Sequence, residues 1–218
     1  MLTCTQAERF INKLGVERYN ERIRVVEKYK DQWELSEITF QQSLSVNSLI
    51  FYAFSKRYGK VILKILINNE FDEDIKEIMS LIQFQGENFC KLYEYSLEDK
   101  VYIMEQIIPA DTLYESARRE ERIKIVGAIF KELHKPDLPD SIFPAYSEWF
   151  EAGKEGTKNR KDCEELRQYL ESAESMLKEI CRKYSRNVLL HGDLHHENIL
   201  KNENGSYTVI DPKGVADD

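Results

Sequence analysis

The chain has 218 residues, of which 42% are hydrophobic and 32% are charged. Such a chain is long and apolar enough to bury a core, so a disordered or fibrous protein is excluded. The formal net charge of −8 argues against a protein that binds nucleic acid through backbone phosphates, because such binding needs a basic surface. An acidic surface suits a cationic small molecule, although ordinary solubility accounts for the same excess of charge.

The sequence carries no signal for a membrane or an oxidising compartment. No apolar run reaches the roughly 18 residues that span a bilayer, and Met1–Gln6 lacks a basic region followed by an apolar one. The cysteines are scattered without a C-x-x-C pair, at Cys4, Cys90, Cys163 and Cys181. We therefore expect a cytoplasmic protein with free thiols and no membrane partner. The oligomeric state is not encoded in any feature of the sequence.

The first half of the chain predicts a helix followed by a sheet. Residues from Thr5 to about Trp33 place apolar side chains at helical spacing, and Gly15 divides this helix into two pieces. After Glu37 the apolar residues gather in short β-rich runs separated by polar or glycine-bearing turns. The expected strands are Ile38–Phe40, Leu49–Phe54, Val61–Leu66, Cys90–Tyr95 and Val101–Glu105, with a helix at Asp72–Phe84.

Lys64 is the unusual residue of the third expected strand, since its neighbours are apolar. Burying an ammonium group without an anionic partner is costly. The following helix offers Glu73 and Glu77 as partners, and Glu77 lies near its middle. Alternatively, the strand lies at the edge of the sheet and Lys64 points into solvent.

The second half of the chain is predicted to be mainly helical. Gln106–Pro109 connects the strands to helices expected at Leu113–Ala117, Glu121–Leu133 and Arg160–Tyr184. Residues Asp137–Thr157 are rich in proline, glycine and aromatic residues. They indicate either a variable segment that helps to recognise a substrate or a surface loop with packed aromatic side chains.

The stretch His191–Asn198 carries the strongest chemical signal. Asp193 and Asn198 have the D-x-x-x-x-N spacing of kinase catalytic loops, with His191 two residues before the aspartate. Two short strands joined by the turn Asn202–Ser206 would bring Asp211 back beside Asn198, although the two are thirteen residues apart. A carboxylate that accepts a proton and oxygen ligands for Mg²⁺ are what phosphoryl transfer requires.

A metal site of another kind is the alternative for the same stretch. Its side chains include possible zinc ligands, namely His191, Asp193, His195, His196 and Asp211. The stretch contains no cysteine, however, and no H-E-x-x-H motif occurs in the chain. His195 and His196 are better interpreted as surface or substrate-side residues.

Two motifs together, His-Gly-Asp with an asparagine five residues after the aspartate and Ile-Asp-Pro-Lys-Gly, resemble the aminoglycoside phosphotransferase branch of the kinase-like fold. The similarity is greatest to the streptomycin 6-kinase and hydroxyurea phosphotransferase group, in which HGDLHxxNIL followed by IDPKG recurs. This resemblance implies an α+β, protein-kinase-like fold of two lobes. Residues 1–108 would form an N-terminal lobe with a helical lead-in, an antiparallel sheet, one helix and a hinge. Residues 109–218 would form a C-terminal helical lobe that is truncated, because the family continues well past IDPKG.

The resemblance also implies a role for each motif residue. Asp193 would be the catalytic base, His191 would brace its loop, and Asn198 and Asp211 would be the ligands of Mg²⁺. In the kinase signature a glycine-rich loop covers the phosphates. The corresponding Ser43–Ser48 contains no glycine, so hydroxyl or amide groups would bind the phosphates instead.

A nucleotide site follows from the same resemblance. Val61–Lys64 is similar to the strand whose lysine holds the α- and β-phosphates of ATP and pairs with a helix glutamate, here Glu77. At the hinge, the carbonyl group of Glu105 and the N–H group of Ile107 are the implied contacts of adenine, with Met104 lining the pocket.

The expected activity is therefore transfer of the γ-phosphoryl group of ATP, with Mg²⁺, to a hydroxyl group of a small cationic molecule. An aminoglycoside such as streptomycin is the first candidate acceptor. Two alternatives remain open: a kinase that acts on a sugar or amino alcohol, and a nucleotide-binding remnant without turnover. The sequence does not identify the acceptor hydroxyl, nor does it distinguish ATP from GTP.

Overall fold

A computed structural model describes residues 8, 11–12, 15–41, 48–67, 73–84, 88–136, 142–158, 160–184 and 188–216. The first half of the chain contains α2 (Val16–Gln32), β1 (Leu35–Phe40), β2 (Ser48–Ser55), β3 (Gly59–Leu66), α3 (Glu73–Gln83), β4 (Leu92–Ser96) and β5 (Val101–Glu105). These bounds lie within a few residues of those predicted. Most of the helix expected before Gly15 lies outside the described residues, as does the expected phosphate loop apart from Ser48, which begins β2.

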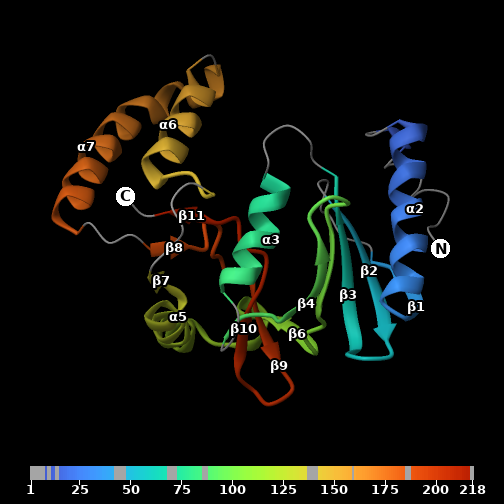
Figure 1. Cartoon of the computed structure of the whole chain (residues 1–218). Helices are drawn as coiled ribbons and strands as arrows, with labels where there is room; N and C mark the ends of the chain where they lie inside the picture. The colour runs from blue at the N-terminus through green and yellow to red at the C-terminus, as the bar shows by residue number, and fades with distance from the viewer. Residues whose placement is uncertain are drawn as a thin grey trace.

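The second half consists of helices and short strands (Figure 1). In chain order these are β6 (Pro109–Thr112), α4 (Leu113–Ser116), α5 (Arg119–Leu133), β7 (Lys135–Pro136), α6 (Tyr146–Thr157), a 3-10 helix (Lys161–Leu166), α7 (Arg167–Lys183), β8 (Val188–Leu190), β9 (Ile199–Asn202), β10 (Tyr207–Val209) and β11 (Val215–Ala216). The predicted hairpin is β9–β10, and β9 also pairs with β6. We retain a lobe boundary near Ile108 as a proposal, because the five-stranded sheet and its two helices precede it.

The strand order β1-β2-β3-β5-β4 places β3 in the centre of an antiparallel sheet. Because side chains alternate along a strand, β3 presents two different faces. Val61, Leu63 and Ile65 share a buried cluster with α2, whereas Ile62 and Leu66 share one with α3. In Figure 1 α3 lies between the sheet and the elements of the second half. Lys64 therefore points to the α3 side, and the interpretation that it lies on an edge strand is wrong.

The contact between α2 and the sheet includes a partly exposed carboxylate. Asp99, in the turn between β4 and β5, accepts hydrogen bonds from Lys28 Nζ at 2.5 Å and Tyr29 Oη at 2.7 Å. These two hydrogen bonds, that from Lys28 first, lower the pKa of Asp99 below its ordinary value. The N-terminal helix is thus linked to the sheet by a charged contact as well as by its apolar side.

We expect Asp99→Asn to lower the free energy of unfolding by about 1 kcal/mol at neutral pH, a modest value because Lys28 is more than half exposed. The folded-state pKa is lowered, so this stabilisation is complete above the unfolded-state pKa and is lost as the pH falls through the folded-state value. Urea unfolding at pH 7 and near pH 3 would measure it. Asp31→Asn, on the exposed side of α2, is the control. A difference that persists unchanged at the lower pH would contradict the assignment.

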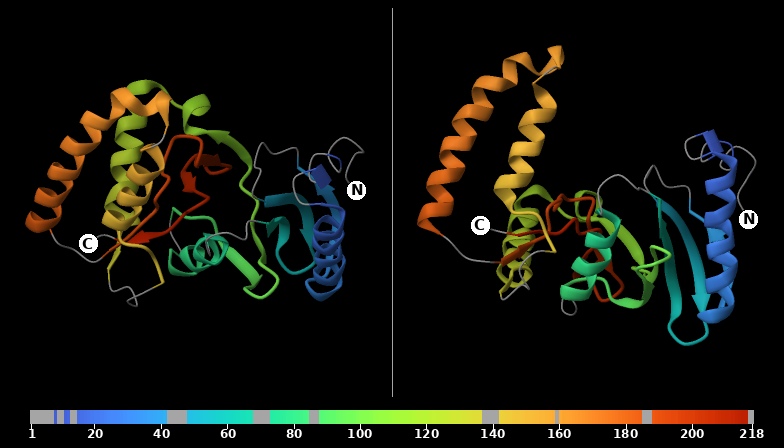
Figure 2. Two further views of the ribbon diagram at one scale, coloured as in Figure 1. Left: turned by 90° about the horizontal axis from the view of Figure 1, so that it is seen from above. Right: turned by 45° about the horizontal axis from the view of Figure 1, so that its top comes forward.

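Residues 146–157 form α6, so the surface-loop interpretation is wrong for this part of the Asp137–Thr157 segment. Gly153 and Gly156 lie within the helix, and glycine disfavours helix by about 1 kcal/mol relative to alanine, which obscures the helical signal. Tertiary contacts stabilise the helix, since α6 and α7 lie side by side (Figure 2) and are joined by an ion pair between Lys154 and Glu174. Residues 137–141 lie outside the described part of the chain.

Within the described ranges, no helix combines the length and the apolar character needed to cross a membrane. Cys90 and Cys163 are buried free thiols, as expected. Burial raises the pKa of the Cys90 thiol far above its ordinary value, so this residue is not a nucleophile at neutral pH. Cys4 lies outside the described residues.

Candidate active site

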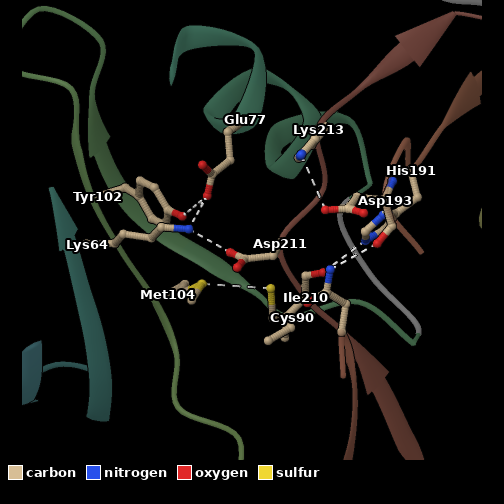
Figure 3. A network of polar contacts seen from close by, with 11 residues as sticks. Lys64, Glu77, Cys90, Tyr102, Met104, His191, Asp193, Ile210, Asp211 and Lys213 are labelled. Carbon is tan, nitrogen blue, oxygen red and sulfur yellow. Dashed lines mark hydrogen bonds and ion pairs between the residues drawn. The ribbon is translucent and has the colours of Figure 1, made fainter. Parts of the chain in front are cut away.

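Lys64 links the sheet, α3 and the end of the β9–β10 hairpin. Its side chain is nearly inaccessible to solvent, and its Nζ donates to Glu77 Oε1 and to Asp211 Oδ1, each at 2.6 Å (Figure 3). Tyr102 lies opposite Lys64 on β5, and its hydroxyl group donates to the same oxygen of Glu77 at 2.5 Å. Sequence reasoning paired Lys64 with Glu77 but missed Tyr102. No local sequence pattern displays the register of β3 and β5 that places Tyr102 opposite Lys64.

The charges of this cluster are unbalanced. Burial lowers the pKa of Lys64, but attraction to Asp211 and Glu77 outweighs it and raises the pKa above the ordinary value. Attraction to Lys64 lowers the pKa of Asp211, whereas burial raises that of Glu77. Two carboxylates share one ammonium group, and Asp211 repels the charge on Glu77. The cluster therefore suits a further positive charge.

His191 links the loop formed by residues 191–198 to the end of the hairpin that precedes Asp211. Its ring is buried, its Nδ1 accepts from the Asp193 N–H group at 3.2 Å, and its Nε2 lies 2.9 Å from the Ile210 carbonyl oxygen. Because Nδ1 is an acceptor, Nε2 carries the proton and donates to that carbonyl group. Burial lowers the pKa of His191, which favours this neutral tautomer. The ring thus fixes the backbone at Asp193 relative to Asp211.

The hairpin brings together the two residues expected to bind Mg²⁺. The Ile210 N–H group donates to the Asn198 carbonyl oxygen at 3.0 Å, and Asn198 Nδ2 donates to the Asp193 carbonyl oxygen at 3.0 Å. The Asn198 amide oxygen is thereby the atom available to a metal. Asp211 has a φ of 58°, a conformation that non-glycine residues rarely adopt and that is concentrated at functional sites.

An amide oxygen and a carboxylate fit Mg²⁺, which takes oxygen ligands and is commonly bound by one or two carboxylates together with substrate phosphates. The excess of negative charge around Lys64 fits a divalent cation as well. In the part of the chain that the structure describes, no group of three or more histidine, cysteine, aspartate or glutamate side chains is arranged to hold a metal. The donor set of Asn198 and Asp211 therefore suits a metal that is also bound by a nucleotide.

The loop after Asp211 is bonded to the loop formed by residues 191–198. The N–H groups of Lys213 and Gly214 both donate to the His191 carbonyl oxygen, at 2.8 and 3.2 Å. Lys213 Nζ lies 3.4 Å from Asp193 Oδ2. Sequence reasoning used Lys213 only as part of a motif and assigned it no role, because the contact joins two loops whose relative position the sequence does not display.

Gly214 is required by this arrangement. It has a φ of 72°, and a Cβ atom there would lie 2.6 Å from the ring of Phe143 and closer still to Ser80 Oγ. We expect Gly214→Ala to cost about 2 kcal/mol of stability more than Gly205→Ala, because overpacking adds to backbone strain. Gly205 is the matched control, with a φ of 83° and open space around it. Denaturant unfolding of both variants would measure the difference; equal costs would contradict the close packing at Gly214.

Of the residues expected at the adenine site, Met104 lies on the same side of the sheet as Lys64, because it pairs with Ile62, whereas the side chain of Glu105 lies on the opposite face. Glu105 is the last residue of β5 and pairs with Val61, and Ile107 follows it as a buried residue. Met104 and Ile107 belong to the core cluster that also contains Ile62. Their roles in nucleotide binding stay predictions, as does the hinge.

The family model described as aminoglycoside/hydroxyurea antibiotic resistance kinase matches residues 33–218. The chain belongs to this family. It is accordingly a phosphotransferase of the aminoglycoside kinase type, which confirms the resemblance inferred from the two motifs. No curated protein sequence matches the chain.

Solved structures of related kinases share the fold. The choline kinase LicA from Streptococcus pneumoniae is 16% identical, with a TM-score of 0.60, and the match covers 90% of this chain and 70% of that one. Spectinomycin phosphotransferase APH(9)-Ia, in complex with ADP and spectinomycin, is 16% identical with a TM-score of 0.55, and the match covers 89% of this chain and 69% of that one. APH(2")-IIa, in a ternary complex with streptomycin and ATP, is 17% identical with a TM-score of 0.57, and the match covers 88% of this chain and 71% of that one. The expected α+β, protein-kinase-like fold is confirmed. The present chain spans about 70% of the length of these solved structures.

Proposed function

We propose that this kinase transfers the γ-phosphoryl group of ATP to a hydroxyl group of a small cationic molecule, with an aminoglycoside such as streptomycin as the first candidate. The supporting observation is that Lys64, on β3, is bonded to Asp211 at the end of the β9–β10 hairpin and that Asp193 lies in the same region of the structure (Figure 3). In this proposal Lys64 is a phosphate-binding cation, Asp193 a proton acceptor and Asp211 a metal ligand, which are the groups that phosphoryl transfer requires. The ternary complex of APH(2")-IIa contains streptomycin and ATP, which supports the choice of both ligands.

The positions of the side chains support the following roles. Asp193 orients the acceptor hydroxyl group and takes its proton while the acceptor oxygen bonds to the γ-phosphorus atom. The bond from that phosphorus to ADP breaks, and its electron pair stays on the β-phosphate oxygen. Lys64, held by Glu77, binds the α- and β-phosphates. Positioning and charge neutralisation supply most of the catalysis in such reactions.

Asn198 and Asp211 would hold Mg²⁺, which neutralises charge on the phosphates when bound. The backbone groups of Glu105 and Ile107 would contact the adenine ring, and His191 would brace the loop. Cytoplasmic residence, the absence of a nucleic-acid partner and the acceptor's cationic character remain parts of this proposal. An acidic protein attracts a cationic acceptor at long range, which supports the last of them.

The deciding experiment is the rate of ADP release from Mg·ATP with and without a panel of acceptors. The panel should contain several aminoglycosides including streptomycin, an amino alcohol and a sugar. Stimulation by an aminoglycoside would support the proposal, and stimulation only by the amino alcohol or sugar would replace the acceptor while keeping the chemistry. Binding of Mg·ATP with no stimulated release would indicate a nucleotide-binding remnant.

A further inference from the structure

The ion pair between Lys213 and Asp193 connects the two loops of the active site at its open side. Lys213 Nζ lies 3.4 Å from Asp193 Oδ2, and the two side chains are 56% and 42% exposed (Figure 3). Exposed ion pairs contribute little to folding stability because solvent screens them and both side chains lose conformational freedom. Structural stabilisation is therefore a poor explanation for this contact.

The backbone, rather than the ion pair, sets where Lys213 stands. Its own N–H group and that of Gly214 donate to the His191 carbonyl oxygen. The absence of a side chain at Gly192 allows this close approach, since a Cβ atom there would lie 3.2 Å from Lys213 Cβ. The lysine side chain is thus projected from a rigid base across the group that accepts the proton. Such preorganisation is the property that makes a cation effective in charge stabilisation.

Lys64, His195 and His196 are basic side chains of the same region of the described structure, and each has other surroundings. Lys64 is bonded to Glu77 and Asp211 on the far side of Asp211. His195 and His196, which follow Asp193 in the loop, line a separate hollow beside α5 together with Phe130. Among Lys64, His195, His196 and Lys213, it is Lys213 whose ammonium group contacts Asp193, beside the place where the acceptor oxygen and the γ-phosphoryl group would meet.

We propose that Lys213 is a catalytic residue whose ammonium group binds the γ-phosphoryl group during its transfer. This inference rests on the proposed function and adds a second lysine to the site. As the acceptor oxygen bonds to phosphorus and the bond to ADP breaks, charge is spread over the equatorial phosphoryl oxygens. Lys213 offsets that charge and keeps its own proton, while the acceptor proton passes to Asp193. In the structure the ammonium group lies beside Asp193.

Kinetics of two substitutions test this role. We expect Lys213→Met to lower kcat by about 100-fold while the KM for Mg·ATP changes by less than about threefold, because the contact is made mainly in the transition state. Lys213→Arg keeps the charge and should retain activity within about tenfold of the wild type. Lys124→Met, on the exposed side of α5, removes the same charge away from the site and should leave kcat unchanged. A Lys213→Met variant with kcat within threefold of the wild type would overturn the proposal.

A binding measurement separates failure of this proposal from failure of the proposed function. Aluminium fluoride with Mg·ADP mimics the phosphoryl group in transfer and needs no acceptor. We expect aluminium fluoride to lower the Kd of Mg·ADP for the wild type. In Lys213→Met this gain in affinity should be at least tenfold smaller, while the Kd of Mg·ADP without fluoride should stay the same. An undiminished gain in Lys213→Met overturns the role of Lys213 even if the enzyme transfers phosphate. Loss of the gain supports the role even if every acceptor on the panel fails, and absence of any ADP binding to the wild type overturns both proposals.

Discussion

Replacing Asp193 by asparagine is expected to lower acceptor-stimulated turnover by about 10³-fold while changing the Kd of Mg·ATP by less than about threefold. Asparagine has nearly the same shape but cannot accept the proton of the acceptor hydroxyl group. The backbone at this position is held independently of the side chain, by His191 Nδ1 at the N–H group and by Asn198 Nδ2 at the carbonyl group. The substitution should therefore leave the loop in place. Stimulated ADP release and nucleotide titration would measure the two quantities.

Glu197→Gln is the matched control for this prediction. Glu197 lies in the same loop with a strongly exposed side chain, so its change removes one negative charge without touching Asp193. Its turnover should stay close to that of the wild type. If Asp193→Asn keeps wild-type turnover, another group accepts the proton. If it loses nucleotide affinity to the same extent as turnover, Asp193 acts in binding and the assignment as base is wrong.

The sequence was sufficient for the parts of the site that lie in local motifs. The D-x-x-x-x-N spacing and the turn at Asn202–Ser206 predicted that Asp211 would return beside Asn198, and the Ile210 to Asn198 hydrogen bond has that geometry. Alternating apolar residues also predicted β3. The face on which Lys64 lies, however, depends on the register between β3 and β5, which no local pattern displays.

Contacts between loops or between strands could not be predicted in this way. Tyr102 bonds to Glu77 because it lies opposite Lys64 on the neighbouring strand. Lys213 reaches Asp193 because both of their loops are bonded to His191. Each depends on two segments that are distant in the chain. The helix α6 was missed for the opposite reason, since its local signal is weak and its stability comes from packing against α7.

The second large effect that we expect is on stability, from Lys64→Met. The substitution leaves Glu77, whose side chain is only 18% exposed, beside Asp211 with no compensating ammonium group. Removing one member of a buried ion pair typically costs about 3 kcal/mol, because the other charge remains buried and unpaired. Urea unfolding of the nucleotide-free protein near pH 7.5 would measure this cost.

The double variant Lys64→Met, Glu77→Gln distinguishes a stranded charge from a simple loss of packing. If the unpaired carboxylate causes the loss, removing it should make the double variant at least as stable as Lys64→Met alone, whereas costs that add would contradict this explanation.

The pH dependence of the stability of Lys64→Met gives a second check. Burial already raises the pKa of Glu77, and loss of Lys64 removes the main charge that opposes this shift. The folded Lys64→Met variant then binds a proton more tightly than its unfolded chain, so its deficit relative to the wild type should grow as the pH rises and shrink toward pH 5. A deficit that is constant over this range would indicate that Glu77 is already protonated in the wild type, and that Lys64 is held mainly by Asp211.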